Sequence, residues 1–281
     1  MTTPRTLLLT LLTMGTLGWP QAAMAQNKNS ATVAAQQPDE DTDANINLSQ
    51  PDFVLVNLPT TLRLPRFKSA FRVTHRFARP LNQDGLLEDL FGLDGGGIIG
   101  LEYRFGLARG LQVGMLRTSD RTMQFFTHYN LLNQTAGKPM GLDVIASMDG
   151  TNNMRDSYTP MLGVNISREL GDRGAVYVSP MWVNNSNPLP GDLVDDNDTI
   201  MVGVGARIRI RPTVYLVGEV SPRAGYKPDS HHASFGLEKR AGGHTFQLNF
   251  SNGLRNTPGQ LARGGSGDDW FLGFNISRKF F

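Results

Sequence analysis

The stretch GIIGLEYRFGLARGLQVGMLRT, residues 97–118, decides the fold class. Its first half alternates apolar with small or charged side chains: Ile99, Leu101, Tyr103 and Phe105 against Gly100, Glu102 and Arg104. A period of two predicts a β-strand with one apolar and one polar face. The turn GLARG then leads into a second alternating run. The stretch therefore predicts a β-hairpin, and leaves open whether its apolar face meets a protein core or lipid.

Similar runs continue along the chain from residue 69 to the last residue. We expect about twelve strands of roughly ten residues each, at 69–78, 97–106, 110–118, 121–132, 140–149, 158–170, 174–184, 199–211, 213–222, 231–240, 243–252 and 270–281. A strand of that length rises about 33 Å, and tilt brings it close to an apolar band about 25 Å tall. The strand length therefore fits a bilayer better than a soluble sheet, whose strands are usually shorter.

The connections alternate in length, which favours a membrane barrel. Short turns such as GLARG, GDR and AGG join some pairs of strands. Most of the other connections are longer and more polar, at 79–96, 150–157, 185–198, 223–230 and 253–269. Short turns on one side and long loops on the other are typical of outer-membrane barrels, in which the short turns face the periplasm. We expect the 79–96 and 253–269 loops to project outwards on the opposite side.

The last strand, WFLGFNISRKFF at 270–281, indicates how the barrel closes. It must pair with the first strand, because an open edge in lipid leaves backbone groups without partners. Its aromatic end also resembles the C-terminal signal that barrel-assembly machinery recognises. Outward aromatic residues should form two girdles at the lipid interfaces: Phe71, Tyr103, Phe105, Tyr129 and Phe280 near the short turns, and Tyr158, Trp182 and Trp270 near the long loops.

The sequence before the barrel divides into three parts. Residues 1–25 have one basic residue, a short apolar stretch and Ala23-Met24-Ala25, the layout of a cleaved secretory signal peptide. Residues 26–50 are small, polar and locally acidic, and predict a disordered periplasmic linker. Residues 51–68 form a lead-in segment whose prolines argue against a central strand; it lies in the periplasm or near the barrel mouth. The barrel domain is expected at 69–281.

Composition narrows the classes of function. The chain has no cysteine, which excludes disulfides and anchoring through a lipid-modified cysteine. Removing the signal peptide takes one of 27 basic residues and none of 25 acidic ones, which leaves a net charge of +1. That balance gives no reason to expect nucleic acid as a partner.

Two stretches resemble a known family. FKSAFRVTHRFARPL at 67–81 and the run from FGLD at residue 91 through residue 132 are similar to the domain-of-unknown-function family 5777 of predicted β-barrel proteins. The HRF and FGLD motifs carry most of the resemblance, together with LEYRFGLARGLQVG. The resemblance implies a barrel in the outer membrane of a diderm bacterium, and it implies no catalytic residues.

The inward face of the strands supplies the candidate functional residues. We expect a lumen lined by charged side chains with an excess of arginine, which would favour anionic solutes. The candidates for the lumen and for ion selectivity are Arg72, Arg76, Glu102, Arg104, Arg207, Arg209, Arg211, Glu219 and Glu238. The alternative is that these charges pair with one another, with the three arginines of 207–211 neutralised by Glu219 and Glu238.

Three functions are compatible with this pattern. The sequence favours a narrow pore or transport component for small solutes. The alternative is a plugged structural barrel whose surface loops act in adhesion or as a scaffold. An outer-membrane lipid hydrolase is less favoured, because no serine motif accompanies His75 or His128. We expect no enzyme activity, no cofactor and no metal; outer-membrane lipid and the assembly machinery are the expected partners, and the sequence indicates no partner protein.

The first prediction concerns processing and location. N-terminal sequencing of the protein from cells should give a mature chain that starts near Gln26. Membrane fractionation should place that chain with the outer membrane, because the strands offer an apolar band to lipid. Recovery of the mature chain in the soluble periplasmic fraction would contradict the barrel.

Overall fold

A computed structural model describes residues 47–82, 95–187, 197–225 and 231–281. The chain divides into two compact units, 1–40 and 41–281, and the described residues all belong to the second. The predicted signal peptide, the linker up to residue 46 and most of the 79–96 loop lie outside the described residues.

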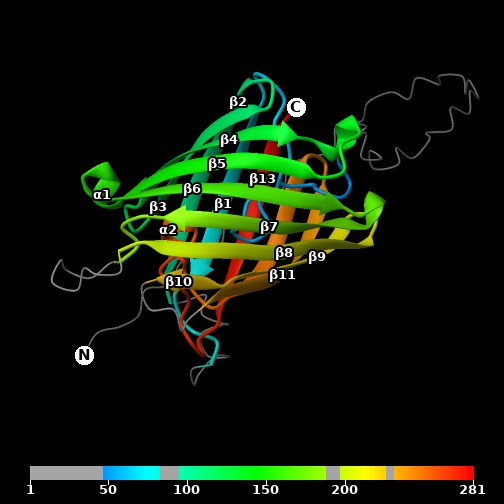
Figure 1. The fold of residues 1–281 in the computed structure, drawn as a ribbon. Helices are drawn as coiled ribbons and strands as arrows, with labels where there is room; N and C mark the ends of the chain where they lie inside the picture. Colours follow the sequence, from blue (N-terminus) through cyan, green and yellow to red (C-terminus); the bar gives the residue numbers. More distant parts are fainter. Residues whose placement is uncertain (1–46, 83–94, 188–196, 226–230) are drawn as a thin grey trace, which may run out of the picture. The chain divides into compact units, whose positions relative to one another are not determined.

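The described chain folds into a closed antiparallel β-barrel of twelve strands with one short extra strand (Figure 1), which confirms the predicted fold class. The strands are β1 Ser69–Phe77, β2 Gly97–Ala108, β3 Leu111–Thr118, β4 Met123–Leu132, β5 Gly141–Gly150, β6 Asp156–Glu169, β7 Gly174–Val183, β8 Thr199–Arg211, β9 Val214–Ser221, β10 Arg223–Gly225, β11 His232–Ala241, β12 His244–Ser251 and β13 Phe271–Phe280. Short helical turns lie between some of them, including α1 Thr151–Met154 and α2 Pro258–Leu261.

Closure occurs where the two ends of the barrel sequence meet. β1 pairs with β13 along its length, from Ser69 opposite Phe280 to Arg76 opposite Gly273. The other strands pair in sequence order, with β9 next to β11, so the twelve long strands form a closed ring. The extra strand β10 extends β9 beyond Pro222, whose carbonyl accepts from the Val202 amide at 2.9 Å, so both strands pair with β8.

Strand residues alternate between a lipid face and a lumen face as the sequence predicts. On β2 the outward Leu101 and Tyr103 are exposed, whereas the inward Glu102 and Arg104 are buried. This polarity is the reverse of a soluble barrel and is typical of a membrane barrel. Exposed or half-buried aromatic residues lie near both ends of the strands, including Tyr129 and Phe280 at one end and Tyr158 and Trp182 at the other.

Most of the short turns lie at one end of the barrel, which we call the short-turn end; the other is the long-loop end, where the four-residue turn 119–122 between β3 and β4 is an exception. Gly242 and Gly243 form the tight turn between β11 and β12, with φ of 48° and 68°. Two successive positive φ values are what a two-residue hairpin requires, and glycine adopts them without steric cost. This geometry fixes the register of β11 on β12, which pairs Ala241 with His244.

The lumen is filled by the residues that precede β1. Residues 49–61 are buried without interruption, and their chain reverses in a hairpin with Val54 bridged to Pro59. The Leu55 amide donates to Leu58 O at 2.8 Å, which closes the hairpin tip. We call residues 47–64 the plug. It includes the last four residues of the expected linker and most of the lead-in segment, and it runs inside the barrel instead of at its mouth.

A second insertion enters from the long-loop end, in the connection between β12 and β13. We call residues 252–264 the inner loop. Thr257 caps α2 by accepting from the Gln260 amide, and the Gln260 side chain accepts from the Thr257 amide, a capping box that orders a one-turn helix. Leu261 and Ala262 are fully buried. The expectation that residues 253–269 project outwards is therefore wrong for residues 253–264. This part folds into the barrel, where its apolar side chains are buried.

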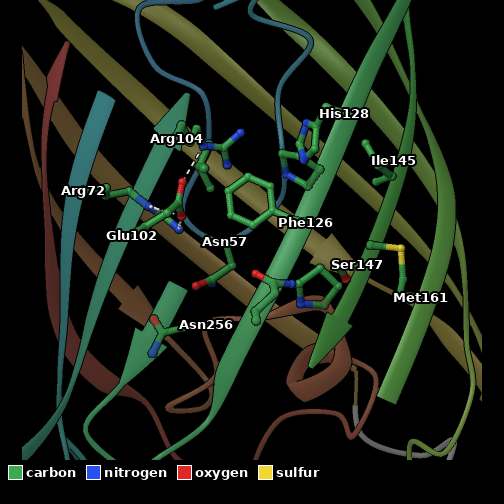
Figure 2. Close-up of a pocket in the computed structure, with 14 residues that line it drawn as sticks. Asn57, Arg72, Glu102, Arg104, Phe126, His128, Ile145, Ser147, Met161 and Asn256 are labelled. Atoms are coloured by element: carbon green, nitrogen blue, oxygen red, sulfur yellow. Dashed lines mark hydrogen bonds and ion pairs between the residues drawn. The ribbon is translucent and has the colours of Figure 1, made fainter. Parts of the chain in front are cut away.

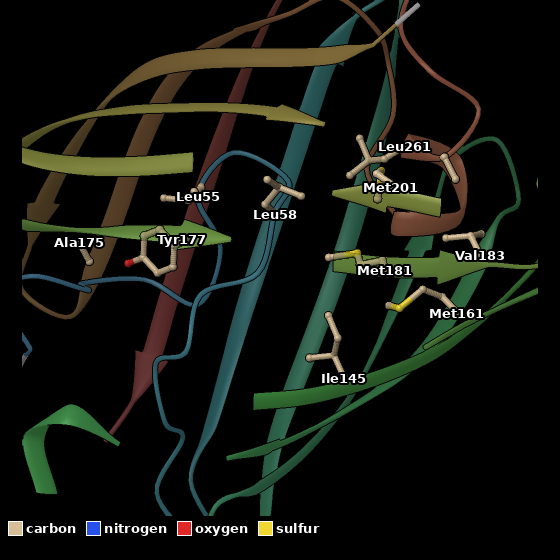
Figure 3. Packing of buried hydrophobic residues seen from close by; sticks show 11 residues of the cluster. Leu55, Leu58, Ile145, Met161, Ala175, Tyr177, Met181, Val183, Met201 and Leu261 are labelled. Carbon is tan, nitrogen blue, oxygen red and sulfur yellow. The ribbon is translucent and has the colours of Figure 1, made fainter. Parts of the chain in front are cut away.

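The two insertions meet in one apolar cluster (Figure 3). Leu55 and Leu58 of the plug and Leu261 and Ala262 of the inner loop belong to it. The barrel wall completes it with Ile145, Met161, Ala175, Tyr177, Met181, Val183 and Met201. Gly203 and Gly205 of β8 permit this packing, because a Cβ on either would lie within 3 Å of a plug leucine side chain.

The helices do not contribute membrane spans. None of the helices in the described ranges combines the length and the apolar character that crossing a bilayer needs.

The register of β8 generates a stability prediction. Val204 faces lipid near the middle of the strand, opposite Val178 and Val220, whereas Ile208 faces lipid opposite Gly174, where β7 begins at the short-turn end. Val204→Arg should cost roughly 2–4 kcal/mol of folding free energy and Ile208→Arg clearly less, because the cost falls towards the interface. Urea unfolding in lipid vesicles measures both; equal costs would contradict this placement of the bilayer.

Candidate functional site

The candidate functional site is the lumen, where the plug is held by polar side chains of the wall. A plug that is not part of the sheet must find partners for its backbone N–H and C=O groups, because buried groups without partners are costly. Wall side chains donate to five plug carbonyls within 3.1 Å: those of Pro51, Val54, Leu55, Val56 and Pro59.

The plug tip is bound by one carboxylate. Glu219 of β9 accepts from three successive backbone amides, those of Val56, Asn57 and Leu58, at 2.9–3.1 Å. It also accepts from the Asn57 side-chain amide at 2.9 Å. Successive amides that converge on an anion form a concave anion site, here built by the plug for a charge on the wall. Glu219 is thus the main acceptor that holds the tip.

Arg207 connects the wall to the side of the plug. Its guanidinium forms an ion pair with Glu238 of β11 at 2.8 Å, and both side chains are fully buried. The same Nη2 donates to the Val54 carbonyl at 2.7 Å. Gln247 of β12 donates to Glu238 at 3.1 Å and to the Leu55 carbonyl at 2.7 Å. The group therefore links β8, β11 and β12 through the plug.

A second ion-pair group lies on β1 and β2 (Figure 2). Glu102 lies between two arginines, with Arg72 and Arg104 each 2.5 Å from one of its oxygens. The Arg104 guanidinium also lies over the rings of Phe53 and Phe126, 5.4 Å and 4.6 Å from their centres. Phe53 belongs to the plug. Arg104 therefore contacts the plug through the face of an aromatic ring, whereas Arg207 contacts the plug through hydrogen bonds.

Arg76 is fully buried near the long-loop end. It donates to Asn57 of the plug at 3.0 Å and to Asn275 of β13 at 2.9 Å. Asn275 donates in turn to the Val56 carbonyl at 3.0 Å. Arg76 and Asn275 thereby hold the tip from β1 and β13, whereas Glu219 holds it from β9.

The base of the plug is bound at the short-turn end. Asp52 accepts from Ser277 of β13 at 2.7 Å, and Lys279 donates to the Pro51 carbonyl at 3.0 Å. Gln50 donates to Glu169 at the end of β6 at 2.6 Å. These contacts reach wall strands on both sides of the plug.

The remaining two candidates do not join these groups. Arg209 is half-buried and Arg211 is exposed, beside a register shift where β8 approaches its turn into β9. Seven of the nine candidates are therefore buried around the plug or in the lumen, and two lie at the rim. The three arginines of 207–211 do not form one inward row, because the bulge ends the alternation before Arg211.

The inner loop closes the other end of the lumen. Thr257 donates to Asp149 of β5, and Arg223 of β10 donates to the Ala262 carbonyl. Burial lowers the pKa of Arg255 from its ordinary value, and the nearby Arg263 guanidinium lowers it further. Arg255 and Arg263 are the two basic side chains that the inner loop brings to the long-loop end.

Little space remains between the insertions. A cavity of about 30 Å³ lies between the plug, the inner loop and the wall, where Asn57, Arg104, His128 and Asn256 line it (Figure 2). That volume holds about two water molecules. This cavity is therefore too small for a solute larger than a few water molecules.

The histidines singled out in the sequence lie on different faces of the wall. His75 faces outwards and stacks on Phe274, 5.2 Å between ring centres, whereas His128 is buried in the lumen. His231 is exposed, whereas His232 is fully buried. Within the described ranges, no three His, Cys, Asp or Glu side chains gather as a metal ion requires.

Comparison with known proteins agrees with this architecture. The model of the membrane bound beta barrel domain family (DUF5777) matches residues 52–280. The chain belongs to this family. The matched range includes the plug from Asp52 onwards, so the plug is part of the DUF5777 domain. A search of curated protein sequences gave no match.

Solved structures share the fold. The NanC porin, in a rhombohedral crystal form, superposes with a TM-score of 0.52 at 9% identity, covering 75% of this chain and 100% of that one. The KdgM porin, in complex with disordered oligogalacturonate, gives a TM-score of 0.50 at 8% identity, covering 76% and 99%. At such identities the likeness concerns the fold of this DUF5777 protein alone.

Sequence reasoning missed the polar residues of the lumen that carry no charge. The wall amides of Asn165, Gln247 and Asn275 donate to plug carbonyls, and Asn57 of the plug accepts from the wall. An isolated amide gives no pattern in a sequence. The signal that could have found the plug is FVLVNL at 53–58, whose successive apolar residues must be buried somewhere.

The buried arginine of the DUF5777 lumen gives a third prediction. Replacing Arg207 by Glu sets a second carboxylate against Glu238 and removes the donor to Val54, so it should destabilise the barrel by about 3–5 kcal/mol. The sequence alone identified Arg207 as a candidate for ion selectivity. Arg211→Glu is the matched control, because the exposed rim position should change stability by less than about 0.5 kcal/mol. Unfolding in vesicles, followed by tryptophan fluorescence, measures both; equal stability of the two variants would contradict the buried pair.

Proposed function

We propose that this protein is a channel of the outer membrane of a diderm bacterium that its own plug holds closed, and that small solutes pass when the plug moves. The observation that carries the proposal is the polar character of the wall behind the plug. A permanently filled lumen would gain stability from apolar packing, since buried ion pairs are often no better than apolar residues of similar size. A wall of charged and amide side chains suits a lumen that water enters.

The way the plug is held supports movement. Beside the apolar packing of Leu55 and Leu58, its tip and sides are bound by hydrogen bonds to side chains such as Glu219, Gln247 and Asn275. Water can replace such bonds group by group, so the net free energy of each is only about 1 kcal/mol. The plug is also outside the β-sheet, so its departure would break no strand pairing.

The wall charge favours anions. Among the described strand residues, seven buried basic side chains stand against five acidic ones: Arg72, Arg76, Arg104, Arg207, Arg223, Arg240 and Lys279 against Glu102, Asp143, Asp149, Glu219 and Glu238. An excess of wall cations attracts anionic solutes into a pore. The KdgM complex with oligogalacturonate is consistent with such solutes in a barrel of this fold.

A second candidate function is a closed structural barrel. The continuous burial of residues 49–61 and the cavity of only about 30 Å³ favour it. In that case the contacts of the long loops would carry the function, in adhesion or as a scaffold.

Single-channel recording in planar bilayers separates these candidates. Glu219→Gln removes the negative charge that three plug amides bind and keeps the size of the side chain. The proposal predicts that it opens the channel at least about tenfold more often than the wild type, because hydrogen bonds to a charged acceptor contribute about 1.5–3 kcal/mol.

A reversible lock supplies the control. The chain has no cysteine, and the Thr61 and Ser167 hydroxyls at the base of the plug are 2.5 Å apart without touching Glu219. Thr61→Cys with Ser167→Cys, added to Glu219→Gln, should abolish openings when oxidised and restore them when reduced. Openings that persist through the oxidised lock would rule out a mobile plug. Absence of conductance in every variant would favour the structural barrel.

A further inference from the structure

The outer wall carries a groove on β11, β12 and β13 that none of the described side chains fills. Its volume is about 340 Å³, and the outward side chains along it are Leu237, Lys239, Phe246, Leu248, Phe274 and Ile276. Pockets that take small ligands begin at about 300 Å³. The groove faces lipid, because these side chains alternate with inward residues such as Gln247 and Asn275.

The register of the three strands orders the groove into rows. Leu237, Leu248 and Phe274 form one row across the strands, and Lys239, Phe246 and Ile276 form the next. The row after that places Ala241, His244 and Arg278 beside the turn at Gly242–Gly243. The groove is therefore apolar towards the bilayer centre and basic towards the short-turn end.

The basic end is ordered. Arg278 donates to the Gly242 carbonyl at 3.0 Å and lies 2.8 Å from Nδ1 of His244, whose ring stacks on Phe246 at 5.8 Å between centres. No acidic residue faces outwards on β11, β12 or β13. Among the described residues, neither Lys239 nor Arg278 has an ion-pair partner. Two positive charges on a lipid-facing wall thus lack a counterion in the part of the chain that the structure describes.

We propose that this groove binds one anionic phospholipid of the leaflet at the short-turn end. One acyl chain lies along the rows of Leu248 and Phe246, and the phosphate lies between Lys239 and Arg278. The negative phosphate complements the positive charges of Lys239 and Arg278. The depth of the phosphate in the bilayer also fits, because long basic side chains near the ends of spanning elements reach the headgroup region. The site is independent of whether the barrel conducts.

Native mass spectrometry of the mature chain in nonionic detergent tests the proposal. Phosphatidylglycerol and phosphatidylcholine with identical acyl chains compete for the protein in equal amounts. We expect one phosphatidylglycerol molecule to be retained in preference. Each basic residue near an anionic lipid contributes a factor of about five in affinity, so Lys239→Gln with Arg278→Gln should reduce the preference about 25-fold.

Two further variants distinguish the groove from general rim charge. Arg168→Gln removes an outward arginine at the same end, on β6, where it donates to Pro139 instead of bordering the groove; it should keep the preference. Ile276→Trp keeps both charges and obstructs the groove, so it should reduce retention of the lipid. Heat-dependent migration on gels checks that each variant is folded.

Several results would overturn the proposal. Equal retention of the two lipids by the wild type, or an equal loss in Arg168→Gln, would reduce the effect to diffuse charge or ordinary solvation by lipid. Displacement of the bound lipid by glycerol 3-phosphate at similar concentration would indicate a phosphate site that does not use the groove. A protein dimer in place of the lipid adduct would assign the groove to a second copy of the chain.

Discussion

Twelve tilted strands enclose more space than their own inward side chains can fill, and the rest of the structure follows from that constraint. Eight strands leave an interior that side chains fill, whereas sixteen or more leave an aqueous channel. Here the missing volume is supplied by two segments of the same chain. The plug enters from the short-turn end and the inner loop from the long-loop end, and Leu58 and Leu261 meet in one apolar cluster. The interior is thus apolar at its centre and polar along much of its wall.

Much of the barrel could be predicted because its determinants are local. Alternation along Ile99–Phe105 identifies both faces of a strand, and the lengths of the turns orient the strands. The register also follows, since a shift by one residue would turn Glu102 and Arg104 towards lipid. Register shifts near Gly106, Asn130 and Arg209 and the break at Pro222 interrupt the predicted pattern, and each lies close to the end of a strand.

The contents of the lumen could not be predicted in the same way. The contact of Glu219 with the plug joins residues more than 160 positions apart, and nothing near Glu219 in the sequence indicates a partner. Prolines at 51 and 59 correctly exclude a central strand, because proline has no backbone N–H to donate. The missing N–H does not indicate where in the protein the segment lies. The charged candidates were found by parity along the strands. Parity does not show that Arg207 reaches past β9 to Glu238 on β11 and to a plug that is not part of the sheet. That explains why Arg207 was identified and its link to the plug was not.

The position of the plug immediately before β1 also bears on how the barrel assembles. The seam between β1 and β13 joins segments about 200 residues apart, and contacts so distant form slowly because chain entropy opposes them. The plug touches both strands of this seam, through Arg72 on one side and through Ser277 and Lys279 on the other. Its tie to β1 is short in sequence and can form early. A plug already seated beside β1 presents Pro51 and Asp52 to the arriving last strand, and so serves as an internal template for the closing step.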